Sequence, residues 1–138
     1  SDMERDFSGA DFSRADMREA SLRQTRLCDA DFWQARLENA LIVQCDLSRA
    51  KLDGLSGKDC RFIKCDLSGA DLSHSQLFQG ALRKCRLSGA DLEGANLYAA
   101  DVTPWVVDEN TVLTGVNSKR TRLEGRQEAL RHVAQRDS

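Results

Sequence analysis

Large apolar residues recur every five positions along most of this chain, from Arg5 to Pro104. Of the twenty central positions in this pattern, nineteen hold a large apolar residue, and the exception is Gly57. Two residues before each centre stands a small residue in eighteen of the twenty units, with Arg5 and Leu55 as the exceptions. A helix repeats its apolar face about every 3.6 residues and a strand about every 2. Because a period of five fits neither, the chain is predicted to bend in the same way in every unit, as a solenoid does.

A second period shows how many units make one coil. Two sets of residues recur at an interval of twenty: Cys45, Cys65 and Cys85, and Ala10, Ala30, Ala50, Ala70 and Ala90. Four five-residue units therefore form one coil, and each side of the coil keeps its own composition. We number the sides 1 to 4 from the first unit on each, centred on Phe7, Phe12, Met17 and Leu22.

The repeated unit resembles that of a known family. The stretch from Cys65 to Ser73 reads CDLSGADLS and contains the unit nearly twice. This is similar to the pentapeptide-repeat family, whose unit is a small residue, Asp or Asn, Leu or Phe, and two further residues. The resemblance covers about three quarters of the chain. It implies an all-β solenoid, a right-handed four-sided parallel β-helix of about five coils over residues 1–104. The residues that follow predict a cap segment and an amphipathic helix over 105–138.

Only two positions in five can be buried in such a coil, because the other three hold mostly Asp, Arg, Ser, Gly and Gln. The predicted core ladder on sides 1 and 2 consists of Phe7, Leu27, Leu47, Leu67, Leu87, Phe12, Phe32, Leu52, Leu72 and Leu92. In the irregular unit around Gly57, the large side chain has moved to Leu55. We interpret this as a local exchange inside the core, and the alternative is a bulge that shapes a binding surface.

The outward positions differ between sides. Side 2 is predicted to be an acidic strip through Asp11, Asp31, Asp71 and Asp91, although capping of the backbone or solvation explains these carboxylates without a ligand. Side 4 is basic and partly apolar, and side 3 carries two outward aromatic residues. We identify a candidate partner surface on these two sides, consisting of Leu41, Val43, Ile63, Arg61, Arg83, Phe78 and Tyr98. The alternative for side 4 is solvated charge over packed side-chain stems.

The C-terminal part leaves the rhythm of five. Residues 105–117 are apolar enough to cover the last coil, which an open solenoid end requires. The stretch from Thr121 to Glu124 reads TRLE, which is typical of a capping box and predicts a helix. One face of that helix, with Leu123, Leu130, Val133 and Ala134, is a candidate for a homodimer contact. The competing arrangement folds the helix back onto Phe78 and Tyr98.

Composition narrows the choices further. A chain of 138 residues with a net charge of −2 is expected to be one domain with no strong attraction to nucleic acid or membranes. It has no apolar run of about 20 residues and no signal peptide. The sequence begins with Ser rather than Met, so a piece of a larger, bacterial protein is one interpretation.

The five cysteines predict free thiols rather than a metal site or disulfides. Cys45, Cys65 and Cys85 fall on the small inward position of one side, about 4.8 Å from one coil to the next, which is further than a disulfide prefers. Cys60 also falls inward, whereas Cys28 falls outward and is the reactive candidate. Retained thiols indicate a reducing compartment, and we expect the cytoplasm.

No catalytic arrangement is visible, since His74 and His132 are isolated and no phosphate loop or metal-binding helix is present. We therefore expect no enzyme activity, no cofactor and no metal. The predicted function is a protein-binding scaffold with an unidentified protein partner. The alternative, implied by the family, is a DNA mimic that binds the type II topoisomerase DNA gyrase and protects it from quinolones. Residues 5–104 hold fifteen Asp and Glu against fourteen Lys and Arg, a net of −1, which is weak for such a mimic.

Overall fold

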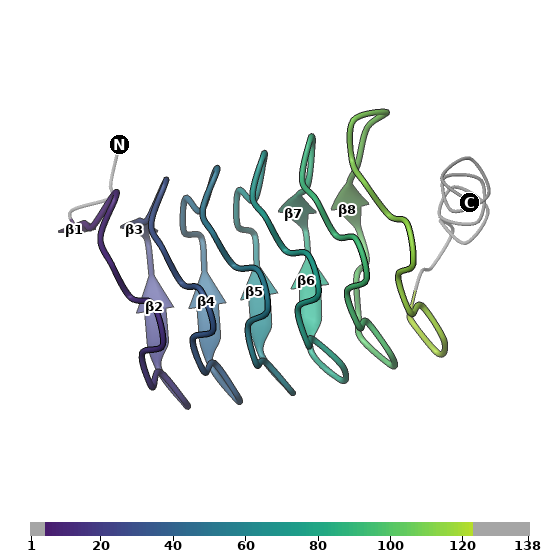
Figure 1. The fold of residues 1–138 in the computed structure, drawn as a ribbon, viewed down its shortest axis with the longest axis horizontal. Helices are drawn as coiled ribbons and strands as arrows, with labels where there is room; N and C mark the ends of the chain where they lie inside the picture. The colour runs from purple at the N-terminus through teal and green to yellow at the C-terminus, as the bar shows by residue number, and fades with distance from the viewer. Residues whose placement is uncertain (1–4, 123–138) are drawn as a thin grey trace.

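The computed structural model describes residues 5–122, which form a rod of stacked coils with the first and last of these residues at opposite ends (Figure 1). The strands are short: β1 (Arg5–Asp6), β2 (Ser21–Arg23), β3 (Thr25–Arg26), β4 (Leu41–Val43), β5 (Arg61–Ile63), β6 (Ala81–Arg83), β7 (Cys85–Arg86) and β8 (Trp105–Val106). The predicted all-β parallel solenoid of about five turns is confirmed.

As far as Val106, each coil pairs in parallel with the next at an offset of twenty residues. On side 4, β2, β4, β5 and β6 form a four-stranded sheet in which Leu22, Ile42, Phe62 and Leu82 are register partners. Isolated parallel bridges continue the pairing on the other sides, for example between Asp46 and Asp66. The twenty-residue period in the sequence is therefore the length of one turn of the backbone.

The chemistry of the unit explains the bend at each corner. The amide of Ala70 donates to the carbonyl of Leu67 at 3.0 Å, and Gly69 between them has φ of 67°, which is typical of a type II turn. The carboxylate of Asp66 accepts the amide of Ser68 at 3.0 Å, as in an Asx turn. The small residue fits inside the corner, Asp caps the backbone and Leu fills the core, so each position of the motif has its own physical role.

The core runs the length of the rod. Eight of the ten residues in the predicted ladder are at most 1% exposed: Leu27, Leu47, Leu67, Leu87, Phe32, Leu52, Leu72 and Leu92. The other two lie in the first coil, where no earlier coil covers them in the described residues. Phe7 is 47% exposed, and half-buried Phe12 stacks on Phe32 with ring centroids 5.1 Å apart.

The solenoid does not stop at residue 104. Trp105 pairs with Cys85, and Val112 pairs with Asp91, so the offset changes from twenty to twenty-one between them. The additional residue lies at the corner after Val107, where the carboxylate of Asp108 accepts the amide of Gly89 at 3.1 Å. In the previous coil the equivalent amide, that of Gly69, donates to the backbone carbonyl of Ser88. The Asp108 carboxylate therefore takes the place of a backbone carbonyl.

The expected helix does not begin at Thr121. The amide of Thr121 donates to the carbonyl of Ser118 at 3.2 Å, and Arg122 bridges Asp101, so both residues belong to a coil. Residues 5–122 contain no helix. Leu123, Leu130, Val133 and Ala134 lie outside the described residues, so the helix and its contact face stay predictions, as does the division of the chain after residue 104.

Candidate functional site

Side 4 carries the four-stranded sheet of β2, β4, β5 and β6 and has apolar residues at outward positions. Within each strand of its sheet the middle residue points inward and the two flanking residues point outward. Leu41 and Val43 flank Ile42, and Arg61 and Ile63 flank Phe62. Leu41, Val43 and Ile63 are half-buried, while Arg61 and Arg83 are exposed. The structure therefore brings these five predicted partner residues together on adjacent strands.

The charges on this sheet are mostly unpaired. Arg83 Nε lies 3.5 Å from the carboxylate of Asp101, and Arg122 reaches the same carboxylate at 3.9 Å. Among the described residues, no carboxylate lies within ion-pair distance of the remaining cations on this face, which are Arg23, Arg61, Lys64 and Lys84. The five-residue pattern did not predict that Asp101 pairs with two arginines. Arg83 and Arg122 lie in the coils before and after Asp101, and the pattern does not show which side chains meet between coils.

The two predicted aromatic residues lie on another face. Phe78 and Tyr98 are half-buried on side 3, and Lys58 Nζ lies 6.0 Å from the ring centroid of Phe78. Beside them runs a ladder of side-chain amides, in which Asn96 donates to Gln76 at 3.4 Å and Asn117 donates to Asn96 at 3.3 Å. The structure thus divides the predicted partner surface into a basic apolar part on side 4 and an aromatic amide part on side 3.

The acidic residues of side 2 serve the backbone, as the capping interpretation predicts. Asp11 accepts the amide of Ser13 at 2.9 Å and its hydroxyl at 2.6 Å, and Asp71 holds Ser73 in the same way. The hydroxyl and then the amide of Ser13 lower the pKa of Asp11. Lys51 bridges both Asp31 and Asp71 in the backbone ladder, so a cation interrupts the strip.

Side 2 also carries an exposed aromatic residue that the repeat pattern did not single out. Trp33 is 39% exposed, and the guanidinium of Arg14 lies 4.9 Å from its ring centroid, within the range of a cation–π interaction. The position of Trp33 directly after an inward centre was the signal that could have identified it.

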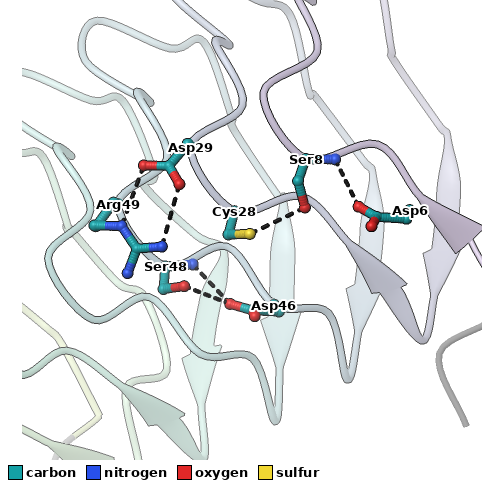
Figure 2. A network of polar contacts seen from close by, with 7 residues as sticks. All are labelled: Asp6, Ser8, Cys28, Asp29, Asp46, Ser48 and Arg49. Carbon is teal, nitrogen blue, oxygen red and sulfur yellow. Dashed lines mark hydrogen bonds and ion pairs between the residues drawn. The ribbon is translucent and has the colours of Figure 1, made fainter. Parts of the chain in front are cut away.

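A network of short polar contacts holds the corners of side 1 (Figure 2). Asp46 accepts both the amide and the hydroxyl of Ser48, at 3.0 and 2.7 Å. Arg49 forms a two-pronged contact with Asp29 of the previous coil, each branch 3.1 Å long. The first of these contacts caps the backbone within one coil, and the second connects consecutive coils.

The cysteines occupy the positions predicted for them and also donate hydrogen bonds. Cys65 Sγ lies 3.3 Å from the carbonyl of Ile42, and Cys85 Sγ lies 3.3 Å from that of Phe62, each in the previous coil. Burial raises the pKa of the Cys45 and Cys60 thiols. Interaction with the Cys85 thiol, followed by burial, raises the pKa of Cys65. All four of these cysteines are buried parts of the core.

Cys28 differs from the other four thiols, because it is only half-buried. Its sulfur lies 3.0 Å from the hydroxyl of Ser8 (Figure 2).

Two shallow pockets on the described surface are lined by polar side chains. One shallow pocket of about 400 Å³ is lined by Asp16, Arg18, Glu19 and Asn39. A second, of about 300 Å³, is lined by Gln44, Cys45, Asp46, Lys64 and Asp66. Within residues 5–122, no three His, Cys, Asp or Glu side chains are arranged to hold a metal ion. The same residues include no helix that could cross a membrane.

Comparison with known proteins agrees with the repeat. The family model for pentapeptide repeats matches residues 6–42, 42–77 and 76–103, in eight copies. No curated protein sequence matches the chain.

Among solved structures, full-length QnrB1, described as a plasmid-mediated fluoroquinolone resistance protein, is 22% identical, with a TM-score of 0.55 over 80% of this chain and 68% of that one. A trypsin-treated R167E form of QnrB1 is also 22% identical, with a TM-score of 0.53 over 95% of this chain and 84% of that one. A pentapeptide repeat protein from the thylakoid lumen of Arabidopsis thaliana is 26% identical, with a TM-score of 0.48 over 94% and 76% of the two chains. The matched residues span most of the chain, and the protein belongs to the pentapeptide-repeat family.

Proposed function

We propose that this protein is a non-catalytic scaffold that binds a protein partner through side 4. The observation that carries the proposal is the sheet of β2, β4, β5 and β6, on which half-buried Leu41, Val43 and Ile63 lie among exposed arginines. Apolar side chains within a charged rim are typical of protein interfaces. The backbone ladder holds these side chains in fixed rows, so little ordering is required when a partner binds.

A function has to be argued from a particular site. Among residues 5–122 we see no group of side chains arranged for catalysis, so the proposal is based on a binding surface. The imidazole of His74 packs against Gly94 in the next coil: a Cβ added to Gly94 would lie only 2.6 Å from His74 Nδ1. The second pocket is lined by Cys45 and by the carboxylates of Asp46 and Asp66, but the Cys45 thiol is buried and its Sγ donates to the carbonyl of Val43 at 3.4 Å. The mixed apolar and basic face of side 4 is therefore the feature on which we base the proposal.

The proposal is tested by capturing proteins from a lysate of the source cells on the immobilised chain. We expect a partner to be retained by the intact protein and lost from a Val43→Ser, Ile63→Ser double variant. Lys51→Gln on the opposite face is the matched control and is expected to retain the partner. Circular dichroism checks that all variants are folded. Capture that is unchanged in the double variant, or no specific capture by the intact chain, contradicts the proposal.

A second candidate is the protection of DNA gyrase from quinolones. It is supported by the likeness of the fold to QnrB1, the fluoroquinolone resistance protein, and by Asp11, Asp31, Asp71 and Asp91 on side 2. Against it, Lys51 interrupts the strip and the repeats carry a net charge close to zero, unlike DNA with one charge per about 1.7 Å.

A supercoiling assay with DNA gyrase and a fluoroquinolone separates the two candidates. The scaffold proposal expects no restoration of supercoiling at any concentration of the protein. Restoration that is lost on Asp71→Asn and Asp91→Asn substitution would favour the second candidate instead.

A further inference from the structure

Positive charge is concentrated on side 4, although the whole chain carries a net charge of −2. The outward rows and the adjoining corner of this side hold one anion, Asp101, and six cations, which are Arg23, Arg61, Lys64, Arg83, Lys84 and Arg122. Six positive charges against one negative charge give this face a local net charge of +5. Because Asp101 lies at the edge and engages Arg83, the centre of the face has no described counter-charge.

The apolar residues lie inside this basic rim. Val43 and Ile63 are register partners in β4 and β5, and Leu41 lies beside them in β4. Along the same row, Arg23 precedes Val43 and Arg83 follows Ile63. The row therefore reads cation, apolar, apolar, cation along the axis of the rod, and Figure 1 shows these four strands side by side along that axis.

The spacing of the row fits an α-helix laid along the rod. Neighbouring strands are about 4.8 Å apart, and one turn of a helix rises about 5.4 Å, so successive turns would meet successive coils. From Arg23 to Arg83 the row crosses three strand spacings, about 14 Å, which corresponds to roughly ten helical residues.

We propose that side 4 binds an amphipathic helix of a partner protein, with an apolar stripe on Leu41, Val43 and Ile63 and acidic residues on both flanks. This inference rests on the proposed function, since it assigns a partner class to the same face. The acidic flanks are required by the unpaired cations, and the apolar stripe is required by the side chains between them. Helices that dock in this way use anchors at intervals of three or four residues.

The face suits other ligands less well. Single-stranded nucleic acid needs aromatic side chains for stacking, and the outward positions of β2, β4, β5 and β6 contain none. A membrane-bound protein inserts apolar side chains about 5–10 Å into the lipid boundary. Leu41, Val43 and Ile63 are half-buried by their neighbours on the sheet, which leaves little apolar surface free for such insertion.

The test is a selection from a library of random 16-residue peptides displayed on phage, with the intact chain as target. We expect the enriched peptides to combine Asp and Glu with Leu, Ile or Phe at helical spacing. A selected peptide should bind about fivefold more weakly to an Arg61→Gln, Lys64→Gln variant, because two exposed ion pairs are lost. Lys51→Gln should leave the Kd unchanged. Circular dichroism of the complex should show helix that the free peptide lacks.

Three results would overturn the inference: enriched peptides that are neutral or basic, binding that the double variant does not weaken, or no enrichment. Cosedimentation with phosphatidylcholine vesicles containing phosphatidylserine is run in parallel, and binding abolished by the same double variant would assign the face to membranes instead. If lysate capture depends on Val43 and Ile63 but the selected peptides are not acidic, the proposed function stands and only the partner class fails.

Discussion

Leu55 fills the space that a larger side chain at position 57 would occupy. A Cβ added to Gly57 would lie 2.7 Å from Leu55 Cδ1 and 3.0 Å from Leu77 Cδ2, and Leu55 itself is fully buried. The exchange of a small and a large residue within one unit therefore preserves the volume of the core, as the compensating interpretation of the sequence predicts. A bulge is not needed, because Gly57 still donates to the carbonyl of Gln76 in the backbone ladder.

This relationship predicts strong coupling between the two positions. Gly57→Leu should destabilise the protein because its side chain collides with Leu55, and Leu55→Ala should cost about 2–5 kcal/mol because it leaves a cavity. The double variant restores the usual unit and should be more stable than either single variant. Urea melts of all four proteins measure the coupling. Simple addition of the two losses would contradict the compensation.

A regular unit provides the reference for the core. Leu67→Ala should lower the free energy of unfolding by about 2–5 kcal/mol, since the side chain is fully buried between coils. Ser68→Ala, at the next position, should cost less than about 0.5 kcal/mol. Equal losses in denaturant melts would show that the inward and outward assignment is wrong.

The thiols should differ in reactivity. Cys28 is half-buried, whereas the other four cysteines are buried, and burial raises the pKa of the Cys60 thiol. Because the thiolate is the reactive form, a maleimide should label Cys28 first under native conditions. Mass spectrometry after brief exposure locates the label. Early modification of Cys65 would place that residue outside the core.

Acid should weaken the corners of the first coil. Hydrogen bonds from Ser13 to Asp11, and from Arg18 to Asp16, lower the pKa of both carboxyls below the ordinary value for an aspartic acid. A carboxyl with a lowered pKa in the folded state stabilises the protein above its unfolded pKa, and this stabilisation is lost as pH falls through the lower folded value. Thermal melts between pH 5 and about pH 2 should show this decline.

Asparagine provides the control for the acid effect. An Asp11→Asn, Asp16→Asn variant keeps a side-chain oxygen for the cap but cannot titrate in this range. Its melting temperature should therefore fall less steeply with acid than that of the unchanged protein. Parallel curves for the two proteins would mean that these carboxyls are not the source of the acid sensitivity.

The predicted C-terminal helix carries a prediction about assembly. If Leu123, Leu130, Val133 and Ala134 form a two-fold contact, the full chain should sediment as a dimer at micromolar concentration, and a chain ending at Arg122 should sediment as a monomer. This length is chosen because the coil includes Thr121 and Arg122. A monomer in both cases would exclude the dimer and leave the folded-back arrangement as the alternative.

The fold could be predicted from the sequence because a period of five, kept for a hundred residues, is compatible with few structures other than a solenoid. The course of the last described coil, after residue 104, could not be predicted. Trp105 stands where earlier coils have a small residue, and the extra residue after Val107 shifts the phase, so the last described coil does not repeat the pattern. The five-residue period already placed Phe78 and Tyr98 on side 3. Which cations of side 4 lack a carboxylate partner could not be predicted, because ion pairs form between coils and depend on how the coils stack.

The change of offset in the last coil has a consequence for how such a protein can change length by duplication or deletion. A gain or loss of twenty residues keeps every later side chain on its own side of the rod, so whole coils can be exchanged without rebuilding the faces. A single inserted residue would shift the five-residue register, so that later inward residues would face outward, unless the additional residue is accommodated at a corner. Asp108 does this by offering its carboxylate to Gly89 in place of the displaced carbonyl. An aspartate at a lengthened corner is therefore a means by which small insertions can enter a rod that otherwise grows by whole coils.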